Sequence, residues 1–181
     1  MDPIETLMHE HKVILTFCDA TVREAERLRS GGALHTERVE RMLDFIRNFA
    51  DRCHHLKEED HLFARMAERG FPVQTGPVAM MLHEHELGRS HVRAVAEALP
   101  RAAAADGAAL AAVADHLTAW AELLRAHIYK EDNILYPMAR QALSAQDMAE
   151  LEVSFEKVER EEMGEGVHER YHRFVHDLAA R

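Results

Sequence analysis

A short pattern of histidine and glutamate occurs twice in this chain, with a spacing that suits metal binding. The first copy has His-Glu-His at 9–11 and His-Leu-Lys-Glu-Glu at 55–59, and the second has His-Glu-His at 83–85 and His-Ile-Tyr-Lys-Glu at 127–131. The copies are offset by 74 residues at His11 and His85, and by 72 at His55 and His127. Two similar halves, each with one His and one His-x-x-x-Glu, predict two metal ions held between them.

Helical spacing indicates which of these side chains point inward. A His and a Glu four residues apart lie on one face of an α-helix, so both reach the same point in a bundle core. Apolar residues in the range 45–66 mark a buried stripe that contains His55 and Glu59. The neighbouring pair, His54 and Glu58, lines up with charged residues and is predicted to face solvent.

The same test separates the histidines of the two His-Glu-His segments. His11 and His85 fall on apolar rows, whereas His9 and His83 point away from them. The predicted metal ligands are therefore His11, His55, Glu59, His85, His127 and Glu131. An unpaired buried carboxylate costs several kcal/mol, and no Lys or Arg belongs to this set, so cations must neutralise it.

Four imidazoles and two carboxylates favour iron or manganese. Each metal would take two His, with both Glu bridging, whereas structural zinc prefers closed tetrahedral sites of nitrogen and sulfur. A bridging oxo, hydroxo or water ligand still leaves coordination positions open. We therefore expect a small ligand to bind there.

Composition narrows the class of protein. A chain of 181 residues with 47% apolar and 30% charged residues predicts one globular domain, residues 1–181. The net charge of −10 argues against nucleic acid and anionic membranes as partners. The two cysteines, Cys18 and Cys53, are expected to be buried thiols in a reducing compartment. With no signal-peptide pattern and no long apolar stretch, we expect a cytoplasmic protein.

Apolar spacings of three and four residues run through the whole chain and predict an all-α fold. Four long helices joined by short loops predict an up-down-up-down four-helix bundle over about residues 3–142. A helical C-terminal extension over about 144–181 would pack outside it. The expected helices cover about 2–30, 36–69, 76–106, 108–142, 144–163 and 167–180, with Pro137 as a kink or early stop.

The order His, His-x-x-x-Glu, His, His-x-x-x-Glu resembles the hemerythrin-like family of HHE cation-binding domains. Segments 53–63, 84–89 and 127–137 look like the signature segments of that family, and the resemblance covers roughly residues 5–142. It implies a four-helix bundle around a non-haem di-iron centre. It also implies chemistry with oxygen, peroxide or nitric oxide.

One departure bears on function. Oxygen-carrying hemerythrins are similar but use His-x-x-x-His in the third helix and a longer His-to-Asp spacing in the fourth. Here Met81 and Arg89 stand four residues from His85, so a fifth histidine is expected to be missing. The resulting symmetric site favours redox or oxygen sensing and stress defence. The alternative is a di-iron redox enzyme that disproportionates peroxide like a catalase, or reduces oxygen or nitric oxide; oxygen or iron storage ranks lower.

Other residues near the pattern are secondary candidates. His168 follows a Gly-x-Gly break and could fold over the bundle end as an extra ligand, or lie exposed in the tail. Asp60 and Asp132 could support the His ligands or face solvent. Tyr129 and Tyr136 could donate hydrogen bonds near the metals or lie at the surface. The expected partner is a diatomic molecule or peroxide, and the chain is expected to be a monomer or homodimer.

Overall fold

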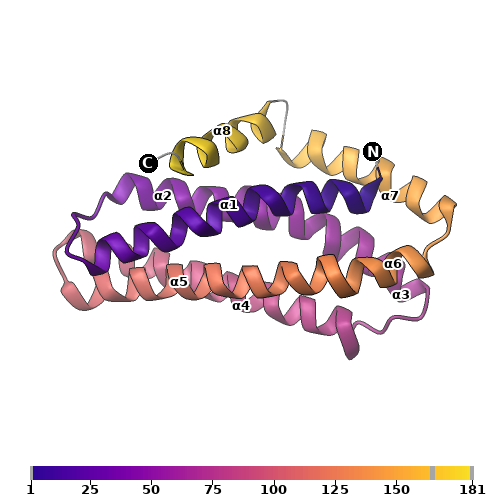
Figure 1. The fold of residues 1–181 in the computed structure, drawn as a ribbon, viewed down its shortest axis with the longest axis horizontal. Helices are drawn as coiled ribbons and strands as arrows, with labels where there is room; N and C mark the ends of the chain where they lie inside the picture. Colours follow the sequence, from indigo (N-terminus) through magenta and orange to yellow (C-terminus); the bar gives the residue numbers. More distant parts are fainter. Residues whose placement is uncertain (1, 164–165, 180–181) are drawn as a thin grey trace.

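The computed structural model describes residues 2–163 and 166–179, and the described residues form a bundle of four long antiparallel helical rods with a helical C-terminal segment (Figure 1). The all-α prediction is confirmed. The first rod is α1 (Pro3–Arg29) and the third is α4 (Gly76–Ala103). The second comprises α2 (Thr36–Phe45), the π-helical segments η1 (Ile46–His55) and η2 (Lys57–Leu62), and α3 (Phe63–Glu68). The fourth comprises α5 (Gly107–Lys130), the π-helical η3 (Glu131–Leu135) and α6 (Tyr136–Ala142).

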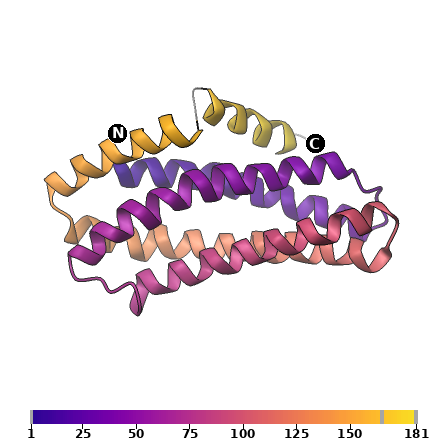
Figure 2. The same cartoon turned by 180° about the vertical axis from the view of Figure 1, so that it is seen from behind.

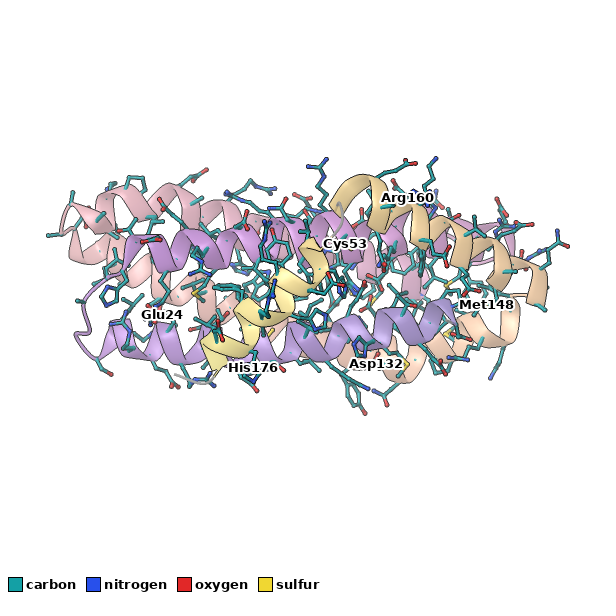
Figure 3. All side chains as sticks on the ribbon, turned by 90° about the horizontal axis from the view of Figure 1, so that it is seen from above. Glu24, Cys53, Asp132, Met148, Arg160 and His176 are labelled. Carbon is teal, nitrogen blue, oxygen red and sulfur yellow. The ribbon has the colours of Figure 1, made fainter. Side chains whose placement is uncertain are left out.

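The C-terminal segment runs back along one side of the bundle. It comprises α7 (Ala145–Val158), the π-helical η4 (Glu159–Met163) and α8 (Val167–Ala179). From behind, these helices again lie outside the four rods (Figure 2). From above, α8 crosses over α1 and the second rod (Figure 3), where the Tyr171 hydroxyl donates to Asp44 and Phe174 lies against Phe17 and Phe45.

The helix ends follow the polar capping residues in the sequence. Asp2 accepts a hydrogen bond from the Glu5 backbone N–H, and Asp106 accepts from the first turn of α5. Ser144 and Asp147 form the predicted capping box at the start of α7. No helix in the described part of the chain is long and apolar enough to cross a membrane.

Pro137 does not end the fourth rod, because the helix continues to Ala142. A proline ring clashes with the carbonyl four residues earlier and offers no N–H. That carbonyl, of Asn133, lies inside η3, and the wider π-helical turn provides room for the ring. The second rod likewise spans the predicted range, but its middle is π-helical over most of residues 46–62.

The bundle has two apolar cores with a polar layer between them. One core contains Phe17, Phe45 and Trp120. The other contains Leu7, Phe63 and Leu135. The predicted metal-binding histidines lie along their helices between these two groups of residues. Each rod therefore positions its polar side chains at one level, enclosed by apolar layers on both sides.

Candidate metal centre

Seven buried side chains meet in the polar layer and form two groups that share one carboxylate. The first group is His55, Glu58, His85 and His127, and the second is His11, His54, Glu58 and Glu131. Within each group the potential ligand atoms lie within 4.8 Å of one another. The exposed fraction of each residue that belongs to these groups is at most 5%.

All four rods contribute to this layer. His11 comes from α1, His85 from α4 and His127 from the last turn of α5. The remaining four come from or next to the π-helical segments: His54 and His55 from η1, Glu58 from η2 and Glu131 from η3. Such segments are frequent at functional sites.

The two carboxylates lie between the two sets of imidazoles. Glu131 places Oε1 3.0 Å from Nε2 of His127 and Oε2 3.3 Å from Nε2 of His11. Glu58 places Oε2 3.4 Å from Nε2 of His85 and 3.6 Å from Nε2 of His54. Each carboxylate therefore faces histidines of both groups, as a bridging ligand must.

Every histidine of the layer is oriented by an acidic side chain at its outer nitrogen. Asp132 lies 2.7 Å from Nδ1 of His11, Glu10 lies 2.9 Å from that of His54, and Asp51 lies 3.2 Å from that of His55. Glu59 lies 2.6 Å from Nδ1 of His85, and Glu84 lies 2.9 Å from that of His127. This arrangement fixes the hydrogen on Nδ1 and leaves the Nε2 lone pair pointing inward. Carboxylate–histidine pairs of this kind are typical of metal ligands.

Two of these supporting carboxylates are themselves held by lysines. Lys57 donates to Glu10 at 2.5 Å and to Glu159 at 2.7 Å, although the Lys57 side chain is fully buried. Lys130 donates to Glu84 in the same way. These contacts fix the carboxylates that orient His54 and His127. Each of these two histidines is therefore supported by an acid, and each acid by a lysine.

The inward-facing atoms lack partners that a metal ion would supply. His55 Nε2, Glu58 Oε2 and both oxygens of Glu131 are buried and have no hydrogen-bond partner among the described residues. Leaving such groups unpaired is expensive. Nε2 of His11 lies 3.0 Å from Nε2 of His54, and His85 and His127 repeat this spacing. Two Nε2 lone pairs at that distance need a proton or a metal ion between them, and the donor set fits metal ions.

The pKa values of the buried groups also indicate a site for positive charge. Burial raises the pKa of Glu131, but attraction to the nearby imidazoles, that of His127 above all, outweighs it, so the pKa lies well below its ordinary value. Burial lowers the pKa of His11, but Asp132 and Glu131 raise it to about 10. The buried carboxylates thus favour positive charge among the imidazoles around them, which a bound metal ion would supply.

Tyr136 is the one phenol at this level in the described part of the chain. Its hydroxyl donates to Glu58 Oε1 at 2.6 Å and lies 3.3 Å from Nε2 of His11. Burial, followed by the negative charge of Glu58, raises the phenol pKa well above its ordinary value. The phenol therefore keeps its proton. Of the two predicted locations for Tyr136, the structure shows the one near the site, whereas Tyr129 is exposed.

The structure brings five of the six predicted ligands together but not Glu59. Glu59 binds Nδ1 of His85 from outside, and Glu58 takes the inner position. His54, predicted to face solvent, is 1% exposed and belongs to the second group. The prediction failed because it assumed 3.6 residues per turn. In the π-helical segments, His54, His55 and Glu58 all reach the interior.

The two groups contain five histidines, one more than the expected set. The additional imidazole comes from the second rod, because both His54 and His55 point inward. An offset of 73 residues pairs His54 with His127, Lys57 with Lys130 and Glu58 with Glu131. Under that offset His55 has no histidine counterpart and makes the layer asymmetric. The recurring lysine was the sequence signal for this alignment.

The secondary candidates fall outside the two groups. His168 lies against Phe49, with Nε2 3.7 Å from Glu10, and belongs to neither His/Glu group. Asp132 supports His11 as one alternative predicted, whereas Asp60 is exposed and Glu59 fills the corresponding role. Cys18 and Cys53 are buried free thiols, and burial raises the pKa of each to about 12.

Sequence comparison agrees with this geometry. The hemerythrin HHE cation-binding domain matches residues 2–139, which is most of the chain. The chain belongs to the hemerythrin family. The resemblance read from the motifs is thereby confirmed, and family membership together with the two buried His/Glu groups supports a metal-binding protein. The matched region ends within α6, so α7 and α8 lie beyond the matched residues.

Curated relatives share this sequence at moderate identity. Uncharacterized proteins of Mycobacterium bovis and of two strains of Mycobacterium tuberculosis are each 26% identical over 161 residues. The alignment covers 89% of this chain but 62% of each relative, so this hemerythrin-like chain spans less than two thirds of their length.

Proposed function

We propose that this chain is a non-haem di-iron protein that binds or reacts with oxygen, peroxide or nitric oxide, in sensing or stress defence. The observation that carries the proposal is the convergence of five imidazole Nε2 atoms on two buried carboxylates. Nitrogen and carboxylate oxygen donors in this number suit iron, with manganese as the other candidate. A solvent-derived oxo, hydroxo or water bridge would complete the pair.

The unequal distribution of histidines supports binding of the small ligand at one of the two metals. One group has three histidines and the other has two, with the carboxylates lying between them. Each group has four residues, and with both carboxylates bridging, the metal held by His11 and His54 would have one protein ligand fewer than its neighbour. Tyr136 lies beside that group, and its hydroxyl is next to His11. A small ligand is expected on this side, within reach of a phenol that retains its proton.

Iron at this centre would supply the electrons and the open coordination position for oxygen, peroxide or nitric oxide. The surrounding residues orient the histidine ligands and enclose them between apolar side chains. Asp132 and Glu10 hold the His11 and His54 rings in place through their Nδ1–H groups. The two apolar cores cover the layer from above and below. Tyr136 keeps one proton at Oη and directs it to Glu58.

Exposure of the reduced, iron-loaded protein to oxygen, nitric oxide and hydrogen peroxide in turn tests this function. Under the proposal, oxygen or nitric oxide changes the visible absorption spectrum within the mixing time. A change that reverses when the gas is removed supports sensing or carriage. If oxygen, nitric oxide and hydrogen peroxide all leave the spectrum and the iron oxidation state unchanged, the proposal is wrong.

A catalase-like enzyme is the second candidate, and the position of Tyr136 favours it. Disproportionation converts two molecules of hydrogen peroxide into one of oxygen and two of water, which requires protons delivered inside a dry site. The Tyr136 hydroxyl is a neutral donor at that place. Catalytic oxygen release that persists over many turnovers and falls in Tyr136→Phe would favour the enzyme; a single stoichiometric oxidation would favour sensing.

A further inference from the structure

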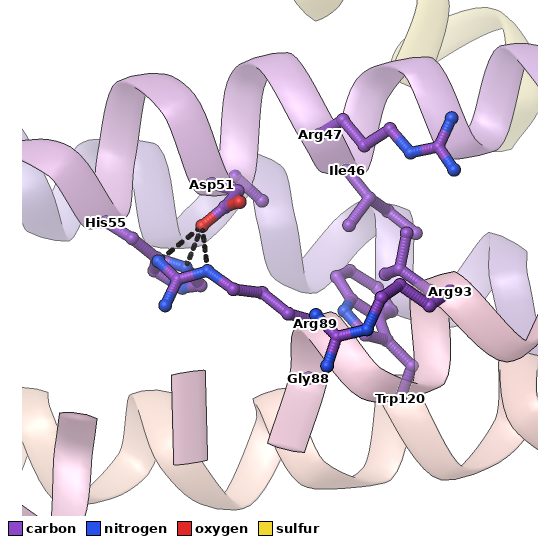
Figure 4. Close-up of a pocket in the computed structure, with 10 residues that line it drawn as sticks. Ile46, Arg47, Asp51, His55, Gly88, Arg89, Arg93 and Trp120 are labelled. Atoms are coloured by element: carbon purple, nitrogen blue, oxygen red, sulfur yellow. Dashed lines mark hydrogen bonds and ion pairs between the residues drawn. The ribbon is translucent and has the colours of Figure 1, made fainter. Parts of the chain in front are cut away.

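A pocket of about 190 Å³ opens beside the candidate centre, between η1, α4 and α5 (Figure 4). His55 forms part of its wall, so the pocket reaches a predicted metal ligand from the side of the bundle. Ile46, Val92 and Trp120 provide an apolar lining. A buried apolar cavity of about 150 Å³ accepts benzene, so this space suits a ligand with a body of about that size.

The polar groups of the pocket are predominantly cationic. Arg47, Arg89 and Arg93 line it, against the single carboxylate of Asp51. That carboxylate is already engaged, since Arg89 donates to it at 2.9 Å and His55 Nδ1 lies 3.2 Å away. Arg47 has no ion-pair partner in the described part of the chain, and Arg93 pairs with an exposed glutamate. Among the residues that line the pocket, three guanidinium groups stand against one carboxylate, and the unpaired Arg47 indicates an anionic ligand.

The indole N–H of Trp120 is a further donor at this pocket. The Trp120 side chain is 3% exposed, and its Nε1 lies 3.7 Å from the place where a Cβ on Gly88 would stand. Both residues line the pocket, and the indole N–H donates to no described residue. A buried indole N–H normally finds an acceptor. The absence of a side chain at Gly88 leaves the space in front of this donor open to a ligand.

We propose that this pocket binds a small organic monocarboxylate with a compact apolar body. Its carboxylate pairs with Arg47 and Arg93 at the rim, and its apolar body packs against Ile46, Val92 and Trp120. The occupant is a single molecule of about the size of benzoate. Nothing in this binding step requires a metal ion.

Arg89 connects this pocket to the candidate centre. Its guanidinium donates to Asp51 and, at 2.7 Å, to Glu59. These two carboxylates hold the Nδ1–H groups of His55 and His85. A bound carboxylate that accepts hydrogen bonds from Arg89 would weaken the contacts of Arg89 with Asp51 and Glu59. The orientation of His55 and His85, which belong to the same group, would then change. This coupling rests on the proposed function, whereas the binding does not.

Benzoate is a suitable probe, and Trp120, the single tryptophan of the chain, is a built-in reporter. Titration of the protein as isolated should change tryptophan fluorescence saturably, while benzyl alcohol, which lacks the carboxylate, should bind at least about tenfold more weakly. Two variants test the contacts of the bound molecule. The double variant Arg47→Gln/Arg93→Gln should weaken benzoate binding by at least about tenfold.

Gly88→Leu should abolish benzoate binding by filling the space in front of the Trp120 indole. Arg140→Gln, an exposed arginine of α6 outside the pocket, is the matched control and should bind as the wild type does.

No saturable change up to about 10 mM benzoate, a range in which even millimolar binding is detected, would overturn the proposal. Equal binding of benzyl alcohol, or unchanged affinity in the double arginine variant, would do the same. Circular dichroism confirms that each variant is folded. Iron analysis of the same samples separates the two claims: benzoate binding without iron refutes only the di-iron function, and iron without benzoate binding refutes only the pocket.

Discussion

At the scale of single residues, Glu58 and Glu59 are neighbours with different roles. Glu58 is fully buried, faces histidines of both groups and accepts from Tyr136. Glu59 lies outside, where it orients His85 and accepts from Arg89. Removing an inner ligand should release metal, whereas removing an outer support should only weaken its binding.

Glu58→Ala should therefore lower bound iron to less than about one per chain, because both metals lose a shared ligand. Glu59→Ala should retain iron with about 10–100-fold lower affinity, the range found for supporting residues. Competition with a coloured chelator measures both. Glu68→Ala, an exposed glutamate of α3, is the control. Equal loss of iron in the Glu58 and Glu59 variants would show that the assigned roles are wrong.

Tyr136→Phe tests the phenol at the same level. The variant should retain its iron, since Tyr136 belongs to neither ligand group, but should lose about 2 kcal/mol of stability because buried Glu58 Oε1 loses its donor. Urea unfolding with parallel iron analysis measures both quantities. The control is Tyr129→Phe, at an exposed position, where no change is expected. Unchanged stability in Tyr136→Phe would contradict the inferred hydrogen bond.

At the scale of elements, the π-helical segments explain both the success and the failure of prediction from sequence. The helices themselves follow from apolar spacing and capping residues such as Asp2 and Ser144, and their ends agree within a few residues. His54 and His55 would lie about 100° apart in an α-helix, so that periodicity admits only one of them to the interior. Nothing in local spacing marks η1 as wider. The lysine shared by both halves, Lys57 and Lys130, was the observable clue.

The C-terminal segment is attached to the second rod by ion pairs on Asp147. Arg69 approaches it to 2.7 Å and Arg65 to 3.0 Å, and Ser144 donates to it as well. Hydrogen bonds from Arg69, then from Ser144, hold the Asp147 pKa well below its ordinary value. Because the unfolded chain binds this proton more readily, the stabilising effect is complete above about pH 5 and is lost progressively as the pH falls below it.

Asp147→Asn should consequently be less stable than the wild type at pH 7, and this difference should shrink as the pH falls from 5 to 2. Thermal unfolding at each pH measures it. Asp115→Asn, at an exposed ion pair of α5, should show a small difference throughout. A stability difference for Asp147→Asn that stays constant over the acid range would contradict the assigned pKa shift.

At the scale of the whole molecule, the polar layer divides the core of the bundle into two parts. Four of its inward-facing atoms are buried and have no hydrogen-bond partner among the described residues. Metal ions that bind only the folded state stabilise it by mass action, by about 4 kcal/mol at a thousandfold excess over Kd. The layer should therefore make the stability of the entire bundle dependent on metal.

Removal of iron by a chelator should lower Tm by about 10 °C, the shift that about 4 kcal/mol produces in a protein of this size. Scanning calorimetry before and after chelation measures the change, and added ferrous iron should restore it. Heating with magnesium in place of iron is the control, because this nitrogen-rich site disfavours it. Equal Tm values with and without iron would show that the layer needs no metal.

The iron content of the wild-type chain tests the central claim most directly. The protein is reconstituted with ferrous iron without oxygen, freed of unbound metal and analysed for metal and protein concentration in the same sample. Five histidines converging on Glu58 and Glu131 predict about two iron ions per chain. A single metal ion per chain, or zinc alone under these conditions, would contradict a di-iron centre.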